Sequence, residues 1–272
     1  EDYRRAGVNR LSFGVQTFDD AVLATLGRIH DSADADAAVR LAQGAGFDNI
    51  NVDLMYALPG QTLAMAERDV ERALALQPAH VSHYQLTLEA NTVFAARPPP
   101  GMPDDDLAWD MQTLCQARLA DAGFVQYEVS AYASQGRACA HNLNYWRFGD
   151  YLGIGAGAHG KITLGAEQSV LRRWKLKHPA AWLATAGTDA AIGGDARIEP
   201  AQRPFEYMLN ALRLNAGFAL VDFESRTGVA RAAIAGSLRK AIDRGWLEPV
   251  DDRVVPTALG RRFGNDVIGL FL

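Results

Sequence analysis

The first half of the chain alternates short apolar segments with amphipathic ones, and this alternation constrains the fold more than any other feature. Candidate strands begin near residues 8, 49, 81 and 124, with capped helical segments between them. A repeat of about 30 to 40 residues is typical of a parallel sheet with right-handed crossovers. The pattern predicts an α/β fold, barrel-like or doubly wound, with functional side chains at the C-terminal ends of the strands.

The later part of the chain is predicted to be organised differently. Segment 141–160 has neither helical nor strand period and is expected to be an irregular functional loop. A stretch rich in Gly, Ala and Asp at 186–196 is expected to be a linker. Residues 201–272 show helical segments followed by WLEPV and RVVPT, which indicate a small β-ribbon and a winged-helix-like module. In the first half, strands are expected at 8–15, 49–55, 80–88 and 124–133, and helices at 19–27, 32–43, 62–76 and 104–122.

Charge and cysteine usage exclude several classes of protein. The chain has 27 Lys plus Arg against 32 Asp plus Glu, so a general nucleic-acid binder is not expected. Two cysteines, Cys115 and Cys139, are too few for a disulfide framework. No leader sequence and no apolar run of about 20 residues is seen, so we expect a soluble, cytoplasmic protein. The opening EDYRRAG reads as the end of a helix, and we expect a piece of a longer protein.

Polar residues stand at the predicted ends of the strands. Asn51 and Asp53 alternate along one strand and so project to the same face of the sheet. A carboxylate there needs a partner, which is either a ligand group or a structural contact such as Arg28. Gln16 offers an amide either to a ligand or to the loop backbone, and the position of Arg28 after Gly27 is also explained by the helix dipole. Other strand-end candidates are Thr87, Tyr127 and Glu128.

The segment HNLNYWRFGDYLGIGAGAHG carries a second set of candidates. Gly155 to Gly160 fits GxGxxG, but no helix and no acid follow as a dinucleotide site requires, so these glycines are expected to allow positive φ or close backbone approach. His141, Tyr145 and Trp146 combine an imidazole with two flat rings, which suits haem or a buried structural corner. Basic residues at 172–178 either bind carboxylates or phosphates or form a solvated face.

Together these motifs resemble the HemW haem chaperones, which are radical S-adenosylmethionine proteins related to oxygen-independent coproporphyrinogen III oxidase. The resemblance covers essentially the whole chain and rests on the segments GVNRLSFGVQTF, GRIH, NVDLMYALPGQT, HVSHYQLTLEANTVF and HNLNYW. It implies an incomplete radical SAM (βα)6-type TIM-like barrel followed by a small α+β winged-helix-like domain. HNxxYW separates the chaperone branch from the oxidase branch.

The resemblance also implies cofactors and the residues that bind them. Members of the family hold a [4Fe-4S] cluster through a CxxxCxxC loop, and neither cysteine of this chain matches that loop. Gln16, Arg28 and Asp53 match family positions that bind S-adenosylmethionine, and Thr87 matches a weaker backbone contact. The family's GLPxQT begins here with Ala57. His141 matches the histidine proposed to take part in haem binding, within a haem region formed by His141, Asn142, Tyr145 and Trp146.

The resemblance implies the function of a haem chaperone that transfers haem to haem-dependent, respiratory acceptor proteins. Two alternatives stay open: an enzyme of porphyrin biosynthesis like the oxidase, and a winged-helix interaction module. No catalytic residue is assigned, and membrane association is expected only through partners. The expected domains are the C-terminal part of the barrel at 1–133, the HNxxYW and glycine-rich region with its linker at 134–200, and the C-terminal domain at 201–272.

Overall fold

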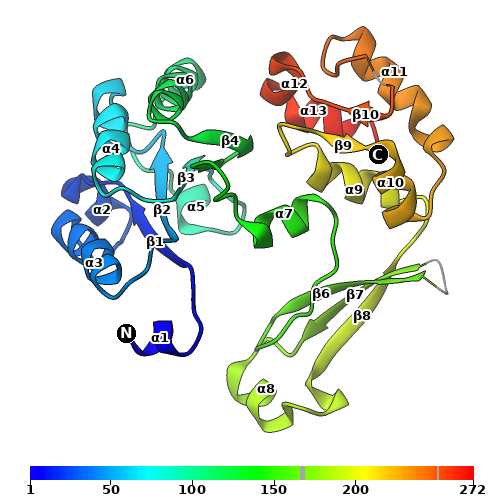
Figure 1. The fold of residues 1–272 in the computed structure, drawn as a ribbon, viewed down its shortest axis with the longest axis horizontal. Helices are drawn as coiled ribbons and strands as arrows, with labels where there is room; N and C mark the ends of the chain where they lie inside the picture. The colour runs from blue at the N-terminus through cyan, green and yellow to red at the C-terminus, as the bar shows by residue number, and fades with distance from the viewer. Residues whose placement is uncertain (166–168, 250) are drawn as a thin grey trace. The chain divides into compact units, whose positions relative to one another are not determined.

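The protein folds into two compact units, Glu1–Cys139 and Ala140–Leu272. A computed structural model describes residues 1–165, 169–249 and 251–272 (Figure 1). The segments predicted as 134–200 and 201–272 therefore share one unit from Ala140 onward. Within the described part of the chain, every helix is too short or too polar to span a membrane.

The first unit is a five-stranded sheet with helices between its strands. The strand order is β1-β2-β3-β5-β4, and β1, β2 and β3 run parallel, as the alternating pattern predicts. The elements in chain order are α1 (Asp2–Arg5), β1 (Leu11–Gln16), α2 (Asp20–Thr25), α3 (Ser32–Gly44), β2 (Ile50–Tyr56), α4 (Leu63–Ala75), β3 (His80–Gln85), α5 (Val93–Ala96), α6 (Asp105–Asp121), β4 (Val125–Glu128) and β5 (Ala131–Ala133).

Helices α3, α4 and α6 cover one face of this sheet (Figure 1). Val52 and Leu54 of β2 point into that core, and Val39, Val70 and Met111 reach it from the helices. Because side chains alternate along a strand, Asn51 and Asp53 project to the opposite face. One face of the sheet is therefore the main hydrophobic core, and the other carries polar groups beside a smaller apolar cluster that includes Met55.

One predicted strand is instead a hairpin. Segment 124–133 forms β4 and β5, which pair antiparallel across a turn at Val129 and Ser130. β5 then joins the edge of β3 in an antiparallel direction. The turn contains neither glycine nor proline, so the local sequence carries no signal for it.

The second unit contains a three-stranded antiparallel sheet, β6-β7-β8, and a helical part with the two-stranded ribbon β9-β10. Phe148, Tyr207, Phe218 and Phe223 are central to the core of the helical part. The elements are α7 (Ala140–Trp146), β6 (His159–Leu164), β7 (Ser169–Lys175), α8 (Pro179–Thr185), η2 (Asp189–Ala191), β8 (Ile192–Ile198), α9 (Arg203–Ala211), β9 (Phe218–Ala219), α10 (Leu220–Thr227), η3 (Arg231–Ile234), α11 (Ala235–Asp243), β10 (Arg253–Val254), α12 (Ala258–Arg262) and α13 (Gly264–Gly269).

Two predictions for this unit differ from the structure, and a third is confirmed in part. The segment expected to be irregular from residue 141 begins with a helix, α7, and the expected linker at 186–196 forms η2 and most of β8. The packing of Trp174 leaves no room for a side chain at Gly194, because a Cβ there would lie 2.4 Å from Cζ2 of Trp174. The predicted ribbon partners WLEPV and RVVPT do meet, at an antiparallel Leu247–Pro256 bridge with Glu248 N donating to the Val255 carbonyl at 3.0 Å, and β10 pairs with β9 as well. Val250, inside WLEPV, lies outside the described residues.

Candidate functional site

A chain of polar side chains crosses the face of the first sheet that lies opposite helices α3, α4 and α6. The amide nitrogen of Asn51 donates to Asp53 Oδ1 at 2.7 Å and to Ser12 Oγ at 2.6 Å, and Ser12 Oγ donates to Asp53 Oδ2 at 3.1 Å. The oxygen of Asn51 contacts His80 Nδ1 at 2.6 Å and accepts from Ser82 Oγ at 3.1 Å. The described hydrogen-bond partners of Asp53 are therefore its neighbours on β1 and β2, and no ion pair with Arg28 is among the described contacts.

Tyr84, near the C-terminal end of β3, contacts one of the sequence candidates directly and is influenced by the charges of two others. Its hydroxyl donates to Gln16 Oε1 at 2.8 Å. Burial raises the pKa of Tyr84, the charge of Asp53 raises it further, and the Gln16 hydrogen bond and the charge of Arg28 oppose that rise. The pKa of the Tyr84 phenol therefore depends on a hydrogen bond with Gln16 and on the charges of Asp53 and Arg28. The sequence analysis did not single out Tyr84.

The position of Gln16 is fixed by the loop that follows it. Gln16 is buried with a φ of 69°, a left-handed conformation that costs free energy for a residue with a side chain. Its neighbours are held by buried Asp69, which accepts from Thr17 Oγ1 at 2.7 Å and from Phe18 N at 2.8 Å. Its amide nitrogen lies over bare Gly14, where a Cβ would come within 2.8 Å. Gln16 is therefore held rigidly at the end of β1.

The other two candidates of this unit differ from each other. Arg28 is exposed, and no carboxylate among the described residues forms an ion pair with it. Thr87 lies beyond the end of β3, and its hydroxyl donates to Glu89 Oε1 at 2.9 Å. Ala57 has a φ of 56°, the conformation that favours glycine, which explains in physical terms why the family motif has glycine at this position.

The second candidate region lies on α7. The ring of His141 packs edge-on against the ring of Tyr145, with 4.8 Å between the ring centroids. The ring centroids of Tyr145 and Tyr151 are 4.4 Å apart. Trp146 is half-buried beneath the guanidinium of Arg213, 4.3 Å from the ring centroid. Asn142 is half-buried, whereas His141 is exposed. The helix therefore presents an imidazole at one end of a row of three aromatic rings, which we call the aromatic row (His141, Tyr145, Tyr151).

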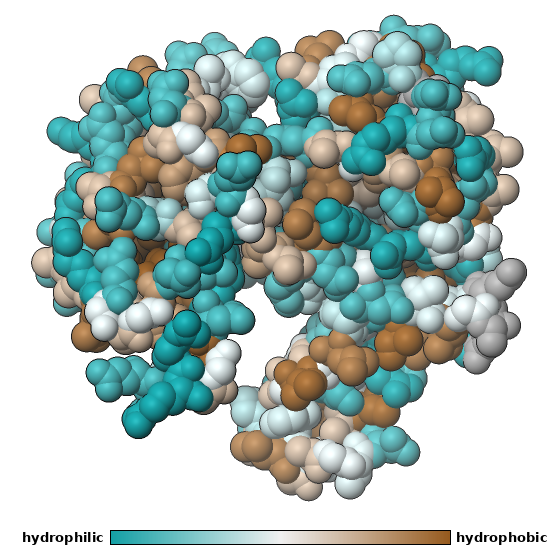
Figure 2. Space-filling model, in the orientation of Figure 1, coloured by the Kyte–Doolittle hydropathy of each residue, from teal (hydrophilic) through white to brown (hydrophobic). Residues whose placement is uncertain are grey.

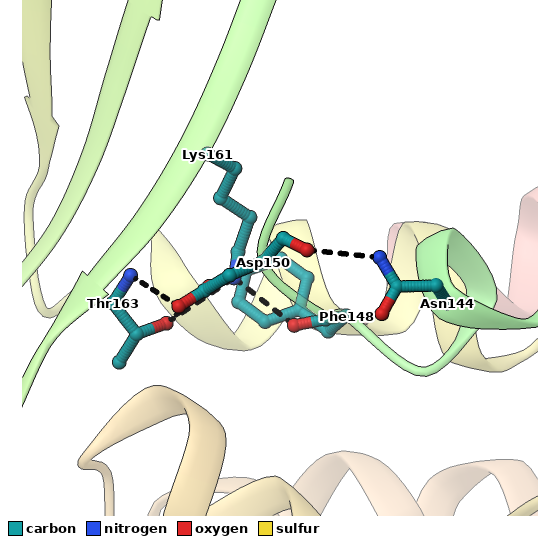
Figure 3. A network of polar contacts seen from close by, with 5 residues as sticks. All are labelled: Asn144, Phe148, Asp150, Lys161 and Thr163. Atoms are coloured by element: carbon teal, nitrogen blue, oxygen red, sulfur yellow. Dashed lines mark hydrogen bonds and ion pairs between the residues drawn. The ribbon is translucent and has the colours of Figure 1, made fainter. Parts of the chain in front are cut away.

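The segment after α7 is anchored by a buried lysine (Figure 3). Lys161 Nζ donates to Asp150 Oδ1 at 2.9 Å and to the carbonyl of Phe148 at 3.0 Å. Burial lowers the pKa of Lys161, and Asp150 opposes that shift. Burial acts to raise the pKa of Asp150, but hydrogen bonds from Thr163 and Lys161 outweigh it and hold that pKa low. Asn144 donates to the carbonyl of Asp150 at 3.0 Å, so α7 is tied to β6.

The glycine-rich segment behaves as the sequence predicts. Gly155 and Gly157 adopt positive φ of 116° and 68°. A Cβ on Gly153 would lie 2.4 Å from the carbonyl oxygen of His159, and one on Gly160 would lie 3.0 Å from Gly153 N. These glycines allow the segment to lie close against β6.

The two cysteines of the chain are not arranged to bind an iron–sulfur cluster. Among the described residues no group of three or more His, Cys, Asp and Glu side chains is placed to hold a metal. Cys115 is buried in the core, and burial, followed by Asp69 and Glu67, raises the pKa of its thiol to about 12. A protonated thiol is a poor ligand for iron, so the described residues do not fit a [4Fe-4S] cluster.

Comparison with known proteins identifies the family of this chain. Residues 1–73 match the radical SAM superfamily, and residues 198–263 match the HemN C-terminal domain. The chain is 44% identical over 271 residues to "Heme chaperone HemW" of Escherichia coli, which covers 100% of this chain and 70% of that protein. The chain belongs to the HemW family. The Bacillus subtilis HemW is 35% identical over 99% of this chain and 71% of its own length.

A solved structure supports the fold of this HemW family member. Coproporphyrinogen III oxidase (HemN) from Escherichia coli, described as a radical SAM enzyme, matches with a TM-score of 0.76. The match covers 99% of this chain and 65% of that chain, at 21% sequence identity. At this identity the likeness shows the fold alone, and it confirms the predicted radical SAM type of α/β architecture.

Proposed function

We propose that this chain is part of a haem chaperone that binds haem and hands it to haem-dependent acceptor proteins, including respiratory ones, in the cytoplasm. The observation that carries the proposal is the identity of 35 to 44% to proteins named heme chaperone HemW over 98 to 100% of this chain. The aromatic row, which begins on α7, supports it, because flat rings pack against a porphyrin face and imidazole ligates iron.

The proposal divides the work between segments. Residues 1–133 would hold S-adenosylmethionine, 134–200 would receive haem, and 201–272 would form the HemW-type C-terminal domain. His141 is the proposed iron ligand, and Asn142, Tyr145 and Trp146 belong to the same haem region.

The haem prediction is tested on His141. Replacing His141 with Ala is expected to shift the Soret band and to lower haem affinity by about tenfold or more, because an axial ligand is lost. Trp146→Phe should have a smaller effect, since a flat ring remains. Spectroscopic titration with haemin measures both quantities. A normal spectrum and affinity in His141→Ala, together with a clear change in Cys139→Ser, would assign the iron ligand to the thiol instead.

The polar groups around Tyr84 suit S-adenosylmethionine. A guanidinium at Arg28 can pair with its carboxylate, the Asp53 carboxylate can accept from a hydroxyl or ammonium group, and the Gln16 amide is pre-positioned. With its cluster, this cofactor supplies radical chemistry in the superfamily. The residues of this chain would bind and orient it.

Asp53→Ala is expected to weaken binding of S-adenosylmethionine by roughly 1 to 3 kcal/mol, the scale for a hydrogen bond to a charged group. Calorimetry should use the chain joined to the cluster-binding segment that the family resemblance implies. Asp48→Ala is a matched control, because Asp48 is an exposed aspartate of the same unit paired with Arg137. Equal affinities in both variants, with the fold intact, would make Asp53 a structural residue only.

A further inference from the structure

The second unit contains a groove of about 450 Å³ between β6, β7, α8 and the glycine-rich segment. This volume lies within the range of about 300 to 1,000 Å³ that is usual for small-molecule sites. Its apolar walls include Leu152, Ile154, Ile162 and Trp182. Neither of the two matching family models, at 1–73 and 198–263, covers this part of the chain, whereas the match to HemW proteins does.

The apolar wall of the groove faces solvent. Leu152 is 75% exposed and Ile154 is 84% exposed, although both side chains are large and apolar. Figure 2 shows apolar residues gathered over the lobe built from β6, β7, β8 and α8. Single exposed apolar side chains are ordinary, but two along the rim of one groove indicate a binding surface.

The groove is formed before any ligand arrives. Tyr151 pairs with Lys161 through backbone hydrogen bonds of 2.9 Å in both directions, which fixes the segment carrying Leu152 and Ile154. Gly153 and Gly160 let this segment lie directly against β6. Little conformational entropy is therefore lost when a rigid, flat ligand enters.

Charged residues of β7 that line the groove indicate which polar group a ligand would carry. Arg173 and Lys175 both line the groove. Arg173 already makes a two-pronged contact with Asp195, at 2.6 and 2.8 Å. Lys175 forms no ion pair with a carboxylate of the described residues. Asp189 also lines the groove and would repel an anion nearby, so the carboxylate of a ligand belongs at Lys175.

We propose that this groove holds the tetrapyrrole ring of haem, with the ring against Leu152, Ile154 and Trp182 and a propionate at Lys175. This inference rests on the proposed haem-chaperone function and gives it a location. Among the described lining residues none is a histidine, cysteine, tyrosine or methionine, so the groove recognises the ring and its carboxylate rather than the iron. An iron ligand such as His141 comes from outside the lining.

The aromatic row links this groove to α7. His141 contacts Tyr145, Tyr145 contacts Tyr151, and Leu152 follows Tyr151 directly in the chain. Substitutions at His141 are therefore expected to alter the Soret band of bound haem. The affinity for the tetrapyrrole ring itself is expected to depend on the groove. The two contributions are separable by experiment.

The test compares haemin with iron-free protoporphyrin IX on the unaltered chain and on Ile154→Asp. Iron-free porphyrin is expected to bind the unaltered chain about tenfold or more weakly than haemin, because it cannot form the proposed bond to His141, and to bind His141→Ala as well as it binds the unaltered chain. Ile154→Asp should weaken both ligands by about tenfold or more, the scale for losing one buried aliphatic side chain. Leu183→Asp is the matched control, because Leu183 is 67% exposed on α8 and does not line the groove.

Lys175→Gln tests the carboxylate. It should weaken protoporphyrin IX by about two- to fivefold, the scale of an exposed ion pair, and leave its dimethyl ester unchanged. If Ile154→Asp binds both porphyrins as the unaltered chain does, or if Leu183→Asp loses as much affinity, the groove is not the site while the chaperone proposal stands. If the unaltered chain binds neither porphyrin, the proposed function itself fails.

Discussion

Acidification from pH 6.5 to pH 4.5 is expected to lower the free energy of unfolding by about 5 kcal/mol through two buried histidines. His80 is fully buried, and its two ring nitrogens contact Asn51 at 2.6 Å and Tyr127 at 2.8 Å. His83 is buried and stacks on the ring of Tyr56 at 4.7 Å. Both are held neutral in the folded state.

The sign follows from the folded pKa values. Burial, followed by the charge of Arg10, lowers the pKa of His80 to about 3, and burial alone lowers that of His83 to about 4. The unfolded chain takes up protons below about pH 6.5, while the folded chain does not. Stability is therefore fully present above pH 6.5 and is lost as the pH falls toward these folded values, at about 1.4 kcal/mol per pH unit for each histidine.

Urea denaturation followed by circular dichroism at pH 4.5 to 7.5 measures this slope. His83→Phe keeps a flat ring against Tyr56 and should remove about half of the pH dependence. A slope in His83→Phe equal to that of the unaltered chain would show that these histidines do not control the acid response.

The parallel core of the first unit could be predicted because its signals are local. Thr62 and Asp104 cap α4 and α6 through their own side chains, as their positions before helical segments indicate. Gly7 takes a positive φ of 97° at the end of the first helix. These features depend on residues close together in the sequence, so alternation and capping were enough.

The elements that the sequence misplaced depend on distant contacts. The glycines of β8 resemble a linker in composition, yet Gly193 and Gly194 are needed because the indole of Trp174 lies against them. α7 has only seven residues, too few for a helical period to stand out among its aromatic and amide side chains. Packing partners decide both cases, and a single sequence does not name them.

Tyr84 shows how a boundary error hides a site residue. The expected strand at 80–88 placed Thr87 at its end, but β3 ends at Gln85, and Tyr84 is the side chain that meets Gln16. Gln16 could be found because it is the last residue of β1, and Asp53 because it is a carboxylate within the largely apolar stretch of β2. Lys161 was missed although it offers a signal: a charged residue within the otherwise apolar and small HGKITL.

Loss of the Asp150 carboxylate is expected to destabilise the second unit strongly. Lys161 is 3% exposed, and its ammonium depends on Asp150, on the Phe148 carbonyl and on the Phe148 ring 4.0 Å away. Removing one partner of such a pair leaves a buried charge without its counterion. We expect Asp150→Ala to cost about 3 kcal/mol, the low end for a buried pair, because Asp150 is itself 44% exposed and screened.

The cost should fall on the attachment of α7 as well as on overall stability. Phe148 packs on Tyr207 in the helical core, and the Asp150 segment bridges that core to β6. Urea denaturation gives the free energy of unfolding, and the hydrogen-exchange rates of the α7 amides should rise as that free energy falls.

Asp150→Asn keeps a hydrogen-bond acceptor and should cost less than Asp150→Ala. The double variant Asp150→Ala, Lys161→Met should recover stability relative to Asp150→Ala, because the uncompensated charge is then gone. A double variant whose loss equals the sum of the two single losses would show that the pair is not coupled.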